Sequence, residues 1–259
     1  MSDYPIFYGP NAVNENSLIT VSSGAAVAYR LYDRDYSTVW KTSGQTSGSS
    51  AATEEILFQE NGVAALKTLD TVILQNCNAV TAVLEFKLSG GWGGAITLTS
   101  ANRAGISLKA AFTAKQAYGL RITFSSTQTA NQEKQIGEVW ALRTLFAPQK
   151  GFYSYEPAFT PITISTDTLD GGVKTALVKW SGDRVTRWSA NLAFAGLSQA
   201  EADTLLAVCA LGGFVLYPEP DTLPQAIYEV SASGDSVSCG YISKVKSGGL
   251  SVGFKAEEA

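Results

Sequence analysis

The chain has 259 residues, a length that suits one large domain or two modest ones. Hydrophobic residues make up 45% of it, enough for a core, and the net charge of −4 argues against a general nucleic-acid binder, which would carry a basic stripe. The sequence contains no histidine, which excludes a Ser-His-Asp or Cys-His mechanism within one chain.

The three cysteines, Cys77, Cys209 and Cys239, lie far apart and form no CxxC pair. We expect them to be small, buried and reduced, as suits synthesis in a reducing cytoplasm. The N-terminus has no basic region followed by an apolar run, which argues against a signal peptide. The longest nearly apolar run, residues 205–216, is too short to span a bilayer, so we expect no membrane insertion.

Residues 1–147 are predicted to form one module of short strands. The chain begins as irregular structure over residues 1–20, and Lys41–Thr53 is predicted to be a loop of small polar residues. Gly90–Gly94 is expected to be a turn that carries Trp92. Strands at this spacing, with turn residues between them, indicate a sandwich or barrel, and we expect them at residues 16–22, 54–59, 69–74, 80–88, 95–99, 106–112, 118–125 and 138–142.

Two stretches are interpreted as the opening and closing elements of this module. Leu31–Trp40 holds two carboxylates, a hydroxyl pair and aromatic residues, and Ile136–Leu142 follows about a hundred residues later. Trp40 is expected to plug the sandwich. Asp33 and Glu138 are expected to meet at one edge of the sheet, where they could cap backbone amides or join carbonyl oxygens around a hard cation such as calcium.

Three short motifs along the first module together resemble a known family. Asp33, Thr38 and Trp40, then Leu120-Arg121-Ile122, then Ile136–Val139 resemble the signature of the discoidin, or coagulation-factor type C, family, which is also found in galactose-binding carbohydrate modules. The resemblance covers roughly residues 12–145 and implies a jelly-roll, galactose-binding-like β-sandwich. Several carbohydrate-binding relatives carry a calcium ion, and the ligands here would be Asp33, Asp35, Thr38 and Glu138.

The resemblance leaves the ligand of this module open. Its loops are rich in Ser, Thr, Gln and Gly, and Trp92 is the one obvious stacking platform among them. The module is therefore either a contact for a host-surface glycan, with Trp92 as the ligand-binding residue, or an assembly module that binds no ligand. Arg121 is expected to be a structural residue of its strand.

Residues 148–259 are predicted to form a second module, a small β-sheet or barrel with one short α-helix at 198–211. Ser198–Glu201 reads as a capping box, and Gly212-Gly213 supplies the C-cap. The segment Phe152–Phe159 is kept extended by Pro157 and covers either its own domain edge or a neighbouring subunit. Strands are expected at residues 162–169, 173–180, 185–194, 214–217, 226–231, 237–244 and 250–255.

The order of hairpin, capped helix, Phe214–Pro218 strand and Pro224–Val230 strand resembles the distal-tail and tail-tip proteins of bacteriophages. This resemblance implies a structural component of a phage or phage-like tail tip or baseplate. Such a chain would be made in the host bacterial cytoplasm, assemble as a homo-oligomer with other tail proteins, and reside in the virion tail. The alternative is a carbohydrate-binding, adhesin-type module without a virion role. Nothing places an acid and a base around a cleft, so we expect no enzyme.

Overall fold

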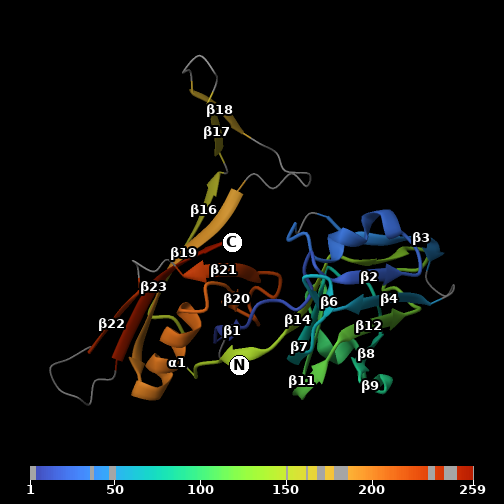
Figure 1. Cartoon of the computed structure of the whole chain (residues 1–259), viewed down its shortest axis with the longest axis horizontal. Coiled ribbons are helices and arrows are strands. Elements are labelled where there is room, and N and C mark those ends of the chain that lie inside the picture. Colours follow the sequence, from blue (N-terminus) through green and yellow to red (C-terminus); the bar gives the residue numbers. More distant parts are fainter. Residues whose placement is uncertain are drawn as a thin grey trace. The chain divides into compact units, whose positions relative to one another are not determined.

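The computed structural model describes residues 4–35, 38–46, 51–149, 151–161, 163–167, 173–177, 186–232, 237–241 and 250–258. The chain divides into two compact units (Figure 1). The first, called the sandwich unit, comprises Tyr8–Thr144 and Glu219–Ala226. The second, called the C-terminal unit, comprises Met1–Phe7, Leu145–Pro218 and Ile227–Ala259. The chain thus changes units after Thr144, three residues before the boundary expected at 147, and two short segments also change units.

The sandwich unit contains two antiparallel sheets, which makes the fold mainly β, as predicted. Strands β4, β8 and β12 bury every second residue, the pattern of a sheet with one face on a core. One sheet has the order β2 (Leu18–Val21), β4 (Ala52–Leu57), β12 (Gly119–Phe124), β8 (Ala82–Leu88), β9 (Gly91–Leu98). The other has the order β10 (Arg103–Ala104), β11 (Ser107–Ala117), β7 (Lys67–Gln75), β14 (Glu138–Leu142).

Short elements close the sandwich unit. They are the pair β3 (Trp40–Thr46) and β13 (Glu133–Ile136), the pair β5 (Gln59–Glu60) and β6 (Val63–Ala64), and the 3-10 helices η1 (Ala25–Leu31) and η2 (Ser100–Asn102). Trp40 is fully buried in the core, as predicted.

The predicted loop at Lys41–Thr53 is wrong over much of its length. Residues up to Thr46 continue β3, β4 begins at Ala52, and residues 47–50 lie outside the described part of the chain. The polar residues become a strand because β13 pairs with them, and the backbone N–H of Lys134 donates to Thr42 Oγ1 at 3.1 Å. Cross-strand pairing here overrides local composition.

Strand β7, predicted at residues 69–74, is covered on both faces. Both Val72 and Leu74 lie in the sandwich core, and Thr71 and Ile73 are buried as well. The segment Glu219–Ala226 belongs to this unit, and the Gln75 side chain donates to the Gln225 carbonyl at 2.7 Å.

The C-terminal unit is built on an eight-stranded sheet with one helix, α1 (Gln199–Cys209). The early strand β1 was not expected, because Pro5, Gly9 and Pro10 indicated irregular structure. A separate hairpin joins β17 (Thr163–Asp167) and β18 (Val173–Leu177). The large sheet has the order β15 (Thr144–Phe146), β1 (Ile6–Tyr8), β20 (Phe214–Tyr217), β21 (Tyr228–Ala232), β23 (Leu250–Glu258), β19 (Thr186–Leu197), β16 (Ser154–Pro161), with β22 (Ser238–Tyr241) paired to β23.

Helix α1 follows the predicted capping signals. The backbone N–H of Glu201 donates to Ser198 Oγ at 3.3 Å, and the Ser198 N–H donates to Glu201 Oε2 at 2.8 Å, which completes the capping box. Gly212 has a φ of 75°, the left-handed conformation that glycine adopts most readily after a helix.

All three cysteines are free thiols, and the expectation that they are buried holds for Cys77 and Cys209 but not for Cys239, which is exposed. No helix in the described part of the chain has the length and apolar character needed to cross a membrane.

Candidate functional site

The predicted calcium ligands Asp33, Asp35 and Thr38 form a turn that uses its own polar groups. Thr38 Oγ1 donates to Asp33 Oδ2 at 2.8 Å, and the Asp35 N–H donates to Asp33 Oδ1 at 3.0 Å. The Thr38 N–H and hydroxyl also donate to the Asp35 carbonyl, at 3.0 and 3.2 Å. Both carboxylate oxygens of Asp33 therefore accept hydrogen bonds that hold the chain between η1 and β3.

Glu138 lies beside this turn, as predicted, but its partner is Arg34. The Arg34 backbone N–H donates to Glu138 Oε1, and Arg34 Nη1 donates to Glu138 Oε2 at 3.0 Å. The same guanidinium donates to the Val13 carbonyl at 3.1 Å and lies 4.6 Å from the ring centroid of Trp140. Burial raises the pKa of Glu138 to about 8, against the lowering effect of Arg34. Arg34 itself has a φ of 60°, which points its backbone N–H at the carboxylate.

The guanidinium of Arg34 beside Glu138 disfavours a calcium ion at this point, and the calcium ligands Asp33, Asp35, Thr38 and Glu138 stay a prediction. The guanidinium of Arg34 holds the cation position beside Glu138, and a calcium ion would need several oxygen ligands around the same point. Among the described residues there is no group of three or more His, Cys, Asp and Glu side chains suited to a metal ion. The motif is a structural clasp of the sandwich.

Trp92 lies in strand β9 and not in a turn, which corrects the prediction for Gly90–Gly94. Leu88 pairs with Gly91 and Lys87 pairs with Trp92, so the hairpin closes through Ser89 and Gly90 alone. The indole is half-buried: Lys87 Nζ lies 5.4 Å and Arg121 Cζ 4.9 Å from its ring centroid. The glycines around Trp92 suggested a loop, but cross-strand pairing carries the strand through them.

Arg121 holds this side of the five-stranded sheet together, as its predicted structural role requires. Its Nε and Nη2 donate to Glu85 Oε2 at 2.9 and 2.7 Å, and its Nη1 donates to Glu55 Oε1 at 3.4 Å. The three residues stand in register on adjacent strands, so the charges form a row across β4, β12 and β8. The guanidinium of Arg121, the middle residue of this row, lies over the Trp92 ring.

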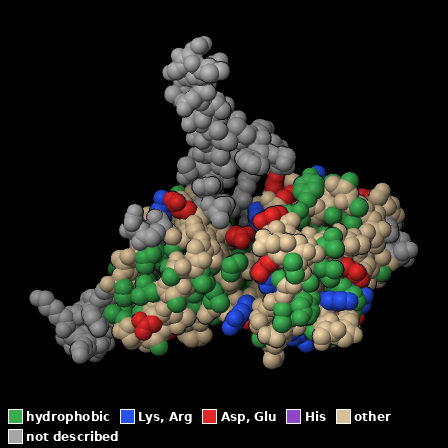
Figure 2. Space-filling model, in the orientation of Figure 1, with side chains coloured by type: hydrophobic (Ala, Val, Ile, Leu, Met, Phe, Trp, Pro, Cys, Tyr) green, Lys and Arg blue, Asp and Glu red, His purple; other side chains and the backbone are tan. Residues whose placement is uncertain are grey.

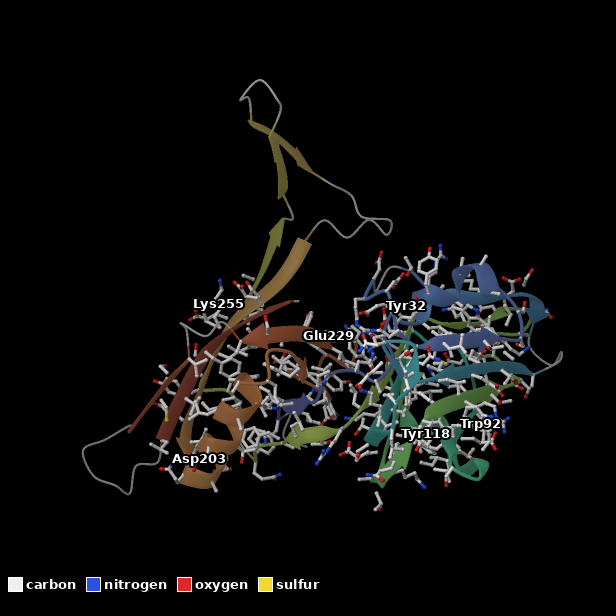
Figure 3. The ribbon with its side chains drawn as sticks, in the orientation of Figure 1. Tyr32, Trp92, Tyr118, Asp203, Glu229 and Lys255 are labelled. Carbon is white, nitrogen blue, oxygen red and sulfur yellow. The ribbon has the colours of Figure 1, made fainter. Side chains whose placement is uncertain are left out.

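An open pocket of about 430 Å³ adjoins Trp92. Lys87 belongs to both features, because it lines the pocket and its ammonium lies over the indole ring. Figure 3 shows Tyr118 and Trp92 near each other on this side of the sandwich, and the Tyr118 N–H donates to the Lys87 carbonyl at 2.8 Å. The lining mixes apolar and polar side chains: Leu57, Gln59, Ala64, Lys87, Leu88, Ser89 and Tyr118.

The sequence pointed to Trp92, which does not line the pocket, and missed the residues that do. Lys87 and Leu88 end β8 and Ser89 follows it, whereas Tyr118 precedes β12, a later strand that pairs directly with β8, so only the sheet brings them together. Figure 2 shows lysine and arginine side chains beside acidic, hydrophobic and neutral ones on the surface of the sandwich unit. The lining supplies one aromatic side chain, an amide, a hydroxyl and an ammonium, which can together hold a polar ligand with an apolar face.

The comparisons with known proteins found similarity only to solved structures. No protein-family model matches the chain, and no curated protein does. A chitosan-binding module 1 of a chitosanase/glucanase from Paenibacillus sp. IK-5 is 19% identical, with a TM-score of 0.40 over 52% of this chain and 98% of that one. A module named CpGH89CBM32-6, produced by Clostridium perfringens, is 15% identical, with a TM-score of 0.39 over 52% and 99%. A structure of the Streptococcus pneumoniae beta-galactosidase BgaA is 16% identical, with a TM-score of 0.39 over 51% and 91%. At such TM-scores the likeness carries no argument about what this chain binds.

Proposed function

We propose that the sandwich unit binds a carbohydrate in the pocket beside Trp92. The observation that carries this proposal is the pocket itself, which is lined by the aromatic ring of Tyr118 and by hydrogen-bonding groups, and whose lining residue Lys87 lies over the Trp92 ring. Sugar rings present an apolar C–H face to an aromatic side chain and hydroxyl groups around their edge. Gln59 and Ser89 can hydrogen-bond such hydroxyls, and Leu57 and Leu88 cover apolar patches.

The backbone hydrogen bonds that hold the pocket walls in place also suit a binding role. Its walls come from strand ends of a packed sheet, and the Tyr118 main chain is held on both sides, by the Lys87 carbonyl at 2.8 Å and by the Phe58 N–H at 2.9 Å. A site built on paired strands is largely formed before the ligand arrives, so little ordering entropy opposes binding. The openness of the pocket allows a chain-like ligand to extend beyond it.

The test is a glycan array followed by calorimetry on the full chain. Trp92→Ala should weaken binding of any glycan that scores by about tenfold or more, since an aromatic stacking contact contributes roughly 1–1.5 kcal/mol or more. Gln59→Ala should weaken it less, by removing hydrogen bonds alone. Tyr153→Ala is the matched control, because Tyr153 is 80% exposed in the C-terminal unit. Silence across the array, or a loss in Tyr153→Ala equal to that in Trp92→Ala, would contradict the proposal.

A second candidate function concerns the C-terminal unit, which we propose as the assembly part of a phage or phage-like tail component. The support is the element order: a strand, the capped helix α1, strand β20 and strand β21 follow one another at the places expected from the tail-protein resemblance. The chain would then lie in the virion tail, form homo-oligomers with other tail proteins, and present its sandwich unit to a host-surface glycan.

Particle size tests this second candidate. Light scattering on the full chain, alone and mixed with candidate tail proteins, should show a ring-sized oligomer or a mixed complex. A chain that stays monomeric and joins no partner leaves only the carbohydrate-binding role. We expect no enzymatic activity from either unit.

A further inference from the structure

We infer that the pocket beside Trp92 selects saccharides that carry a carboxylate, an inference that rests on the proposed carbohydrate-binding function. Among the seven residues that line the pocket, Lys87 is the one with a charged side chain. Its ammonium lies over the Trp92 ring and has no carboxylate partner among the described residues. A half-buried ammonium in the wall of a ligand pocket is a ready partner for an anion.

The carboxylates near the pocket form ion pairs with other cations. Glu85 stands two residues before Lys87 on β8, but it accepts two hydrogen bonds from Arg121, at 2.9 and 2.7 Å. Glu55 accepts from the same guanidinium at 3.4 Å. Glu60, next in sequence to the lining residue Gln59, is paired with Lys67. Lys87 is therefore the one charged residue of the pocket lining, and it forms no ion pair with a carboxylate of the described residues.

The contact between Lys87 and Trp92 leaves N–H groups of the ammonium available to donate hydrogen bonds to a ligand. An ammonium over an aromatic ring keeps N–H groups that point away from the ring, because it carries three donors and the ring accepts from one side only. The arrangement places a stacking surface and a cation next to each other. A uronic acid fits both at once, with its ring against an aromatic side chain and its carboxylate on Lys87. An amino sugar would bring a second ammonium toward Lys87 and is disfavoured.

The experiment compares ligands that differ in charge. Calorimetry on the full chain at pH 7 would use trigalacturonate, the uncharged galactose trimer and a cationic glucosamine trimer, each at about 50 and 500 mM NaCl. We expect trigalacturonate to bind about five- to tenfold more tightly than the galactose trimer at low salt, from one charge-assisted hydrogen bond in a partly exposed site. The advantage should shrink at high salt, which screens exposed charges.

Substitutions assign the preference to one residue. Lys87→Gln should remove the preference for the acidic trimer, and Lys87→Arg, which keeps the charge, should retain it. Lys115→Gln is the matched control, because Lys115 also has its ammonium over a ring, that of Phe86 at 5.5 Å, but does not line the pocket. It should retain the preference.

The outcomes separate this inference from the proposed function. If the acidic and neutral trimers bind equally well, the inference is wrong and carbohydrate binding stands. If no trimer binds and the glycan array is silent, the proposed function and the inference fall together. If Lys115→Gln removes the preference as fully as Lys87→Gln, the preference reflects overall charge and not this pocket.

Discussion

The sandwich unit places a cation over a tryptophan ring at two positions, and the two differ in how the cation is used. At the clasp, Arg34 lies 4.6 Å from the Trp140 centroid and also binds Glu138 and the Val13 carbonyl. At the pocket, Lys87 lies 5.4 Å from the Trp92 centroid with no carboxylate partner in the described part of the chain. Trp140 and Glu138 are buried, whereas Trp92 and Lys87 are half-exposed.

This difference separates a structural site from a binding site. A buried charge must be paired, because removing it from water without a partner costs several kcal/mol. A half-exposed charge can stay unpaired in the protein at little cost, since water solvates it. The acidic motif drew attention from the sequence because it concentrates charged and aromatic residues, yet the Asp33 carboxylate accepts hydrogen bonds from Asp35 and Thr38, and Arg34 pairs with Glu138. The less conspicuous Lys87 is the one left available.

The largest effect should follow from breaking the clasp. Arg34→Met leaves the Glu138 carboxyl buried, with 1% of its side chain exposed, and without its cation. Above about pH 8, where the Glu138 carboxyl is ionised, we expect the free energy of unfolding of the sandwich unit to fall by about 3–5 kcal/mol. Hydrogen exchange of the strands of this unit during urea titration measures it separately from the C-terminal unit. A loss below about 1 kcal/mol would show that Arg34 does not stabilise Glu138.

A different effect should follow at Glu54, a buried carboxyl that has no cation partner among the residues that the structure describes. Both its oxygens are buried without a hydrogen-bond partner, and burial raises its pKa well above 4.5. A carboxyl whose pKa is higher in the folded than in the unfolded state stabilises the fold fully below about pH 4.5. That stability is lost as the pH rises toward the pKa of the folded state.

Glu54→Gln should therefore match the wild type most closely at low pH and exceed its stability increasingly above about pH 4.5. The gap should grow by at most about 1.4 kcal/mol per pH unit, and unfolding measured from pH 4 to 8 would show it. Glu138 also has a raised pKa, but both proteins contain it, so the difference isolates Glu54. Glu55→Gln is the control on the opposite face of β4, where the side chain is 38% exposed, and its stability should show no such growth.

A still smaller change in stability is expected on replacing Arg121, whose ion pairs are partly exposed. Arg121→Met removes hydrogen bonds to Glu85 and Glu55 that are partly exposed, and the free energy of unfolding should fall by about 0.5–1 kcal/mol. The substitution also leaves Glu85 unpaired beside Lys87. We therefore expect the preference for an acidic saccharide to weaken, which the trimer titrations would measure. An unchanged preference would mean that Glu85 does not influence Lys87.

The smallest effect on stability should come from Lys87 itself. Lys87→Met removes an exposed cation–π contact of about 0.5–1 kcal/mol and adds apolar packing on the same ring, so the net change should be below about 0.5 kcal/mol. The same urea titration measures it. A loss comparable to that of Arg34→Met would place Lys87 among the structural residues and remove the contrast between the two sites.

Parts of the fold followed from local patterns. The capping box at Ser198 and Glu201 needs two side chains three residues apart, so helix α1 was predictable within two residues. Strand β20 was predicted with its observed limits, since Gly213 and Pro218 bound an apolar run. The polar strand β3 and the Gly-rich start of β9 were not predictable from their own composition, because each forms through pairing with another strand. The partner of β3 is β13, which is distant in the sequence, and the partner of β9 is β8, which precedes it.

Taken alone, the sequence determined the mainly β character of the chain, the capped helix, the burial of Trp40 and the meeting of Asp33 with Glu138, since these depend on spacing and on apolar residues that must leave water. Only the tertiary structure decided what the charged residues do. Whether a carboxylate or an ammonium is paired depends on which segments become neighbours: the turn after η1 places Arg34 beside Glu138, the sheet places Arg121 beside Glu85, and Lys87 lines a pocket.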